Sequence, residues 1–177
     1  MILFFAAPAM AINFDKYTKD TEIKTALNVL YNANAHEVFD NLDENTIHIA
    51  FYDLILLSPD YGRHFAVNTV DSLGNRFILI NSKFKHASAE ELACLIAHES
   101  FHKLNIATVD EEALATKKEA QYWDKLKISN KMYEHSELFK RLENLSKLNA
   151  ETNMNNDYIL EKICNNSFYR QQLAIAQ

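Results

Sequence analysis

The sequence predicts an α+β fold that is mostly helical, with a small and mainly antiparallel three-stranded sheet packed against the helix that contains His98 and His102. Glycine and proline are scarce, with two of each among 177 residues, and long stretches rich in Leu, Lys, Glu and Asn favour helices. β-Branched and aromatic residues concentrate between residues 46 and 81, which indicates strands there. Hydrophobic residues make up 48% of the chain, enough to form a core.

The first eleven residues are predicted to be a signal peptide, and residues 12–177 a single domain. The apolar run at the N-terminus is too short to span a bilayer as a helix, and no stable membrane span is expected in the mature chain. Ala9 and Ala11 are small residues of the kind that a signal peptidase requires, so cleavage after Ala11 is expected. The run lacks a basic segment before it. We expect a periplasmic or secreted protein, and the alternative is a cytoplasmic protein with a buried N-terminus.

A helical segment is predicted before the strands. Apolar residues recur at helical spacing from about residue 20 to residue 41, and residues 32–34 are a candidate break. The first strand is predicted at residues 46–57, which are rich in β-branched and aromatic side chains and are followed by Ser58 and Pro59.

Two further strands are predicted at residues 63–70 and 76–81. They flank residues 71–75, a turn-forming segment that contains Gly74. The pair is therefore expected to close an antiparallel hairpin.

The next predicted helix spans residues 88–104 and contains the sequence His-Glu-Ser-Phe-His, an HExxH motif. Ser88 followed by Glu91 three residues later indicates a capping box at its start. Because a helix advances by about 100° per residue, His98 and His102 share one face, and both imidazoles can bind a single metal ion. The alternative is an amphipathic helix whose histidines are packed or exposed without a metal.

Glu99 follows the first histidine and lies beside the pair. A Zn²⁺ ion bound by two imidazoles has room for a third protein ligand and for a water, whose pKa it lowers to about 7. Glu99 is placed to accept the proton of that water as a general base. The motif therefore indicates a hydrolase that binds one Zn²⁺ ion.

The third ligand is expected after His102. One zinc-protease pattern has a glycine three residues later and a histidine six residues later, but Asn105 and Thr108 occupy those positions. The other common solution is a glutamate on a following helix. Residues 108–123 form such a helix, with Thr108 or Asp110 as its cap and an acidic first turn that suits the helix dipole.

Residues 88–127 resemble the gluzincin-type zinc metallopeptidases, small zincin-like proteins in which HExxH is followed by a helix with a glutamate ligand in a Glu-x-x-Ala setting. The sequence Glu-Ala-Leu-Ala at residues 112–115 matches that setting. The resemblance implies a zincin-like fold and Glu112 as the third zinc ligand, with Glu111 as the alternative.

The chain departs from these relatives at Thr116, where many of them have an aspartate that orients a zinc-binding histidine. Glu119 is seven residues after Glu112 and shares its helical face, so it is a candidate for that task. The alternative for Glu111, Glu112 and Glu119 is a solvated helix face paired with Lys117 and Lys118.

The resemblance implies a zinc-dependent peptidase with a peptide or protein substrate. The strand before the zinc helix, at residues 77–81, is the candidate edge for binding an extended peptide, and the alternative is an inner strand without a free edge. A non-catalytic exported protein with a structural zinc site or a peptide-holding cleft is a second hypothesis, and an exported helical interaction module without metal is a third. The net charge of −6 and the absence of a basic stripe argue against nucleic acid as a partner.

The remaining residues are expected to form amphipathic helices at 131–149 and 157–176. Cys94 and Cys164 can form a disulfide only if the last helix lies beside the zinc helix, and otherwise Cys94 is a small buried hydrophobe.

Peptide hydrolysis also requires a group that stabilises the oxyanion. The candidates, which the sequence does not rank, are Tyr122, Tyr133, His135 and Tyr158.

Overall fold

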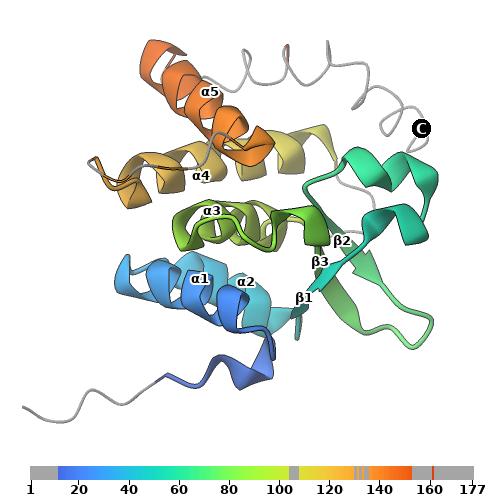
Figure 1. The fold of residues 1–177 in the computed structure, drawn as a ribbon. Helices are drawn as coiled ribbons and strands as arrows, with labels where there is room; N and C mark the ends of the chain where they lie inside the picture. Colours follow the sequence, from blue (N-terminus) through green and yellow to red (C-terminus); the bar gives the residue numbers. More distant parts are fainter. Residues whose placement is uncertain are drawn as a thin grey trace, which may run out of the picture.

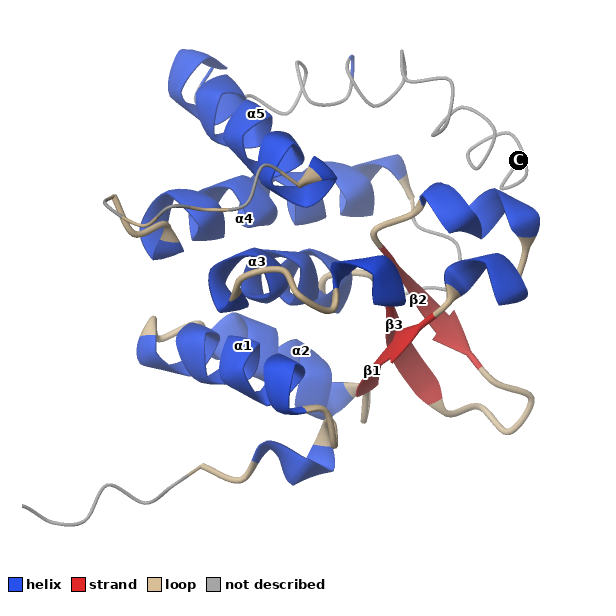
Figure 2. Ribbon diagram, viewed as in Figure 1, coloured by secondary structure: helices blue, strands red, loops and turns tan. Residues whose placement is uncertain are grey.

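The computed structural model describes residues 12–103, 108–129, 131, 133, 136–152 and 161. Helices α1 and α2 lie on one side of α3, α4 and then α5 lie on its other side, and the sheet lies at one end of these layers (Figures 1 and 2). The predicted mixture of helices with one small sheet is confirmed. The elements are α1 (Thr21–Asn32), α2 (His36–Glu44), β1 (His48–Tyr52), β2 (Ala66–Val70), β3 (Arg76–Asn81), α3 (Ala89–Ser100), α4 (Val109–Leu126) and α5 (Glu137–Thr152).

Helix α3 is the central element of the fold. It contacts α1 and α4 and also packs against β2 and β3. Its apolar side chains, such as Leu92 and Ile96, are almost fully buried, and burial of a side chain of this size stabilises the fold by roughly 1.5–3 kcal/mol. Every residue from Glu90 to Ser100 is buried. The polar residues of the HExxH motif therefore lie in the protein interior.

The helical segment before the strands is confirmed, including its break. α1 ends at Asn32 and α2 begins at His36, and Asn34 between them has a φ of 54°, in the left-handed region that asparagine tolerates better than most residues. α2 continues to Glu44, so the predicted end at residue 41 is too early.

The first strand is shorter than predicted. β1 ends at Tyr52, which pairs with Asn81, the last residue of β3. The sheet as described has no strand that continues alongside the following residues. Leu54–Leu56 and Pro59–Arg63 instead form two short 3-10 helices.

The predicted hairpin is confirmed, but the sheet is not mainly antiparallel. β2 and β3 pair antiparallel, and Gly74 in their turn has a φ of 87°, which glycine adopts without strain. β1 pairs with β3 in the parallel direction, which gives the strand order β1-β3-β2. Because β3 is the inner strand, the predicted peptide-binding edge at residues 77–81 is wrong, and β1 and β2 are the edges of the described sheet.

The two C-terminal helices of the described chain differ from the prediction at their ends. Thr108 is the N-cap of α4, which continues to Leu126 beyond the predicted residue 123. α5 begins at Glu137 and not at residue 131, because the Ser136 hydroxyl accepts a hydrogen bond from the Phe139 N–H at 2.9 Å and caps the helix there.

The predicted signal peptide at residues 1–11 lies outside the described residues. The predicted helix at 157–176 also lies outside them, apart from residue 161. Among the helices that are described, none is both long enough and apolar enough to cross a membrane.

Candidate metal centre

A capping box starts the helix that carries the motif, as predicted. The Ser88 Oγ accepts a hydrogen bond from the Glu91 N–H at 3.2 Å, and the Glu91 carboxylate accepts one from the Ser88 N–H at 2.9 Å. α3 ends two residues before His102, earlier than the predicted residue 104. The following turn continues the path of the helix, because the His102 N–H donates to the Glu99 carbonyl at 3.3 Å. The two motif imidazoles therefore remain neighbours, with ring centroids 5.1 Å apart.

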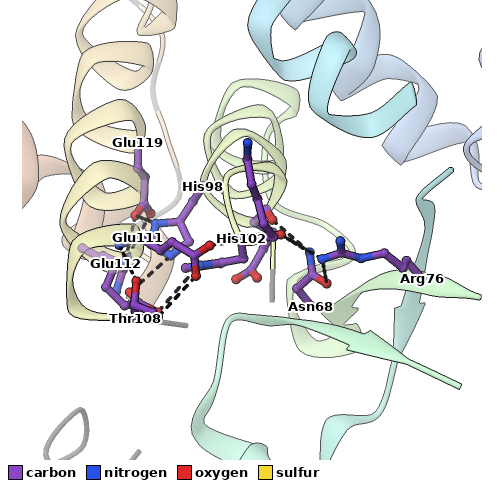
Figure 3. A network of polar contacts seen from close by, with 11 residues as sticks. Asn68, Arg76, His98, His102, Thr108, Glu111, Glu112 and Glu119 are labelled. Carbon is purple, nitrogen blue, oxygen red and sulfur yellow. Dashed lines mark hydrogen bonds and ion pairs between the residues drawn. The ribbon is translucent and has the colours of Figure 1, made fainter. Parts of the chain in front are cut away.

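Two polar side chains of the hairpin hold the C-terminal end of α3. Asn68 on β2 donates through Nδ2 to the carbonyls of Glu99 and His102, at 3.1 and 3.2 Å. Arg76 on β3 donates to the same His102 carbonyl at 3.0 Å and to Asn45 Oδ1 at 2.8 Å (Figure 3). These bonds add side-chain donors to the carbonyl of Glu99, which also accepts from the His102 N–H, and to the carbonyl of His102, which lies beyond the helix end. The contacts of Asn68 and Arg76 with the motif were not predicted from the sequence. Their only signal in the sequence is a polar side chain within each strand.

Helix α4 brings Glu112 to the two histidines and keeps Glu111 at its own N-terminus. Glu111 forms a second capping box with Thr108. Glu112 Oε1 lies 3.5 Å from His102 Nε2, and Glu112 Oε2 lies 3.7 Å from His98 Nε2. Of the two glutamates, Glu112 is thus the one that groups with the motif (Figure 3).

His98, His102 and Glu112 could hold a metal ion. Each offers one ligand atom, and these atoms all lie within 4.8 Å of one another. A tetrahedral zinc site with bonds of about 2.0–2.2 Å places its ligand atoms roughly 3.3–3.6 Å apart, so side chains whose ligand atoms lie within 4.8 Å need only small shifts to bind one ion. All three side chains are buried, and Glu112 Oε2 has no hydrogen-bond partner among the described residues. Because an unsatisfied buried carboxylate oxygen is costly, the group fits a cation.

The surroundings of the motif also favour a cation. Burial raises the pKa of Glu99 to about 7 and raises the pKa of Glu112 as well. Burial and the neighbouring His98 lower the pKa of His102 to about 3, so this imidazole is neutral and has a lone pair for a metal. A divalent cation among these groups would favour the ionised carboxylates and the neutral imidazoles.

Glu119 contacts the nitrogen of His98 that faces away from Glu112. Its side chain is fully buried, and its Oε2 lies 3.0 Å from His98 Nδ1. Burial opposes the ionisation of Glu119, but Arg141 on α5 and His98 hold the pKa of Glu119 at about 2. Glu119 therefore contacts the metal-binding candidate His98 from the side opposite Glu112. The alternative of a solvated face is wrong for both Glu112 and Glu119.

Two of the tyrosines predicted as oxyanion stabilisers have other partners. The Tyr122 hydroxyl donates to Glu37 on α2 at 3.0 Å. The Tyr133 hydroxyl accepts a hydrogen bond from the Ile128 N–H at 2.8 Å. The remaining two candidates, His135 and Tyr158, lie outside the described residues.

Cys94 is a free cysteine in the core, where burial raises the pKa of its thiol well above the ordinary value. Within the described part of the chain, it does not belong to the group that could hold a metal. Cys164 lies outside the described residues, and so does the disulfide that the sequence allows between the two cysteines.

The chain matches no protein-family model, no curated protein and no solved structure. The fold and the centre together define a mixed α/β protein, mostly helical, with a buried group of two imidazoles and one carboxylate that could hold a metal ion. The activity has to be inferred from this group and its surroundings.

Proposed function

We propose that this protein is a zinc-dependent peptidase of the gluzincin type, in which His98, His102 and Glu112 bind one zinc ion and Glu99 is the general base. The observation that supports it most is the convergence of two imidazole nitrogens and a carboxylate beside a buried glutamate. Two imidazoles and one carboxylate are a ligand set that zinc hydrolases use. The zincin-like fold belongs to the same proposal.

The residues around the centre suit peptide hydrolysis. A zinc ion held there would lower the pKa of a coordinated water and polarise a substrate carbonyl. Glu99 is 7% exposed and lies close enough to His98 and Glu112 for their charges to alter its pKa. As a carboxylate, Glu99 can accept a proton from such a water and release that proton to the leaving amine.

A catalytic site is favoured over a structural one by the number of protein ligands. Structural zinc sites have four protein ligands, whereas catalytic sites have three and an open position. Among the described residues the group contains two histidines and Glu112, and Cys94 is not part of it. This difference supports the peptidase over the non-catalytic zinc protein.

The β2 edge is the proposed binding surface for the substrate backbone. β2 pairs only with β3 among the described strands, and an extended peptide that paired with its other side would add a strand to the sheet. Asn68 on β2 also binds the carbonyls of Glu99 and His102, which places this strand directly beside the motif.

Hydrolysis of unfolded proteins by the purified chain tests the proposal. The wild type is expected to cleave, a chelator to stop cleavage, and added zinc to restore it. Glu99→Gln should lower the rate by roughly 10²–10⁴-fold because the general base is lost. Glu111→Gln is the matched control, since that residue caps α4, and it should retain the rate. Cleaved termini identified by mass spectrometry would also define the substrate preference. Undiminished hydrolysis by Glu99→Gln would contradict the mechanism.

A further inference from the structure

Arg141 links helix α5 to the candidate metal centre. Its Nε donates to Glu119 Oε1 at 2.9 Å, and its Nη2 donates to Glu119 Oε2 at 2.7 Å. The guanidinium also lies over the ring of Phe65, 5.3 Å from the ring centroid. Two parallel bonds fix the plane and the direction of a carboxylate, which one bond does not.

The orientation of the Glu119 carboxylate determines which nitrogen of His98 holds a hydrogen and which presents a lone pair to a metal. Glu119 Oε2 lies 3.0 Å from His98 Nδ1, within donor–acceptor distance, although Nδ1 is not aligned for a hydrogen bond with any of the described residues. A small rotation of the imidazole would let an Nδ1–H donate to this carboxylate oxygen. An imidazole held in this way keeps its hydrogen on Nδ1 and directs the lone pair of Nε2 to the opposite side. That side is where Glu112 Oε2 lies, 3.7 Å from His98 Nε2.

We infer that Arg141 is a positioning residue of the metal centre, acting through Glu119 to fix the ring and the tautomer of His98. The inference rests on the proposed metal site and adds α5 to it. Loss of a partner that orients a metal-binding histidine typically lowers metal affinity by about 10–100-fold. By this inference, metal binding by residues of α3 and α4 depends on a residue of α5 that binds Glu119.

Other contacts between α4 and α5 provide a matched control. Glu143 on α5 accepts a hydrogen bond from Trp123 Nε1 at 2.8 Å and forms an ion pair with Lys127. Both partners of Glu143 lie at the C-terminal end of α4, beyond Glu119. Glu143→Gln therefore weakens the docking of α5 without changing the carboxylate that contacts His98.

The test measures zinc affinity of the full chain by competition with a chromophoric chelator, with circular dichroism to verify folding. Arg141→Met and Glu119→Gln are each expected to bind zinc about 10–100-fold more weakly than the wild type, and Glu143→Gln as tightly as the wild type. The visible spectrum of the Co²⁺ form should change in the first two variants and not in the third, since it reports ligand geometry.

The double variant Glu119→Gln with Arg141→Met removes both charges of the ion pair and provides the comparison if Arg141→Met alone does not fold. Because both residues act through one carboxylate, it should bind zinc as Glu119→Gln does. Wild-type affinity in Arg141→Met, an equal loss in Glu143→Gln, or a double variant much weaker than Glu119→Gln would overturn the inference. A wild type that binds no zinc would instead contradict the proposed metal centre itself.

Discussion

Glu111 and Glu112 are consecutive residues with different surroundings. Consecutive helical residues point about 100° apart, so one can face the helix start while the other faces the histidines. Glu111 accepts hydrogen bonds from the N–H groups of Thr108 and Lys103. Glu112 is 8% exposed and has an oxygen without a hydrogen-bond partner among the described residues. One residue therefore stabilises α4, and the other is available to a metal.

Substitution of each glutamate separates these two tasks. Glu112→Gln is expected to lower zinc affinity by more than about 100-fold, because a ligand matters more than the outer partners whose loss costs about 10–100-fold. Glu111→Gln should keep its zinc affinity and lose at most about 1 kcal/mol of unfolding free energy, from a weaker cap. Chelator competition and urea unfolding measure the two quantities. Equal losses of affinity would contradict the role assigned to Glu112.

Glu99 is expected to destabilise the metal-free chain as pH rises. Burial raises its pKa from 4.5 to about 7, so the folded chain holds this proton more tightly than the unfolded chain. The free energy of unfolding therefore falls as pH rises from about 4.5 to about 7. Glu99→Gln removes this loss and should be more stable than the wild type at pH 8, by up to about 3 kcal/mol. Urea unfolding with a chelator at pH 4.5 and at pH 8 measures the difference, and a difference that does not change with pH would contradict the account.

The hairpin supports the motif through the end of α3. A helix C-terminus leaves carbonyl groups without partners, and the last of them here belong to the turn that carries His102. Asn68 donates to the carbonyls of Glu99 and His102, and Arg76 donates to the carbonyl of His102, from the adjacent strands. The sheet thereby fixes the part of the motif that lies beyond the helix.

Asn68→Ala is expected to lower the free energy of unfolding by about 1–3 kcal/mol, because it removes two part-buried hydrogen bonds that each contribute about 0.5–1.5 kcal/mol. Asn75→Ala is the matched control on the same hairpin. Asn75 is exposed and bonds only within its turn, so its loss should cost no more than about 0.5 kcal/mol. Urea unfolding compares the two variants. An equal cost would show that Asn68 does not hold the helix end.

In the whole molecule, the centre is assembled from elements that are separate in the chain. α3 and its turn provide two histidines, α4 provides Glu112, and α5 provides Arg141 behind Glu119. The layers α3, α4 and α5 are neighbours in this order (Figure 1). Correct packing of three helices is therefore a condition for the site.

The local part of this arrangement is predictable from the sequence. The spacing of His98 and His102 depends only on helix geometry, and the capping boxes at Ser88 and Thr108 depend on residues three positions apart. Resemblance to gluzincins favours Glu112 over Glu111, and the structure places Glu112 beside the histidines.

The outer contacts of the site and the strand order of the sheet depend on contacts between residues that are distant in the sequence. Nothing next to Arg141 or Asn68 in the sequence indicates that these side chains reach α4 and α3. The parallel pairing of β1 with β3 depends on how the chain crosses from β1 to β2, and the strand patterns alone do not determine strand order. The predicted free edge at residues 77–81 was wrong for this reason.

Metal content of the purified full chain tests the central claim most directly. Prepared without chelators and measured by inductively coupled plasma mass spectrometry, the wild type and Glu99→Gln are each expected to contain about one zinc ion per chain. His98→Ala and His102→Ala should contain almost none, while circular dichroism shows that they remain folded. Full zinc content in the folded His98→Ala chain, or a wild type without any bound metal, would contradict the proposed metal centre.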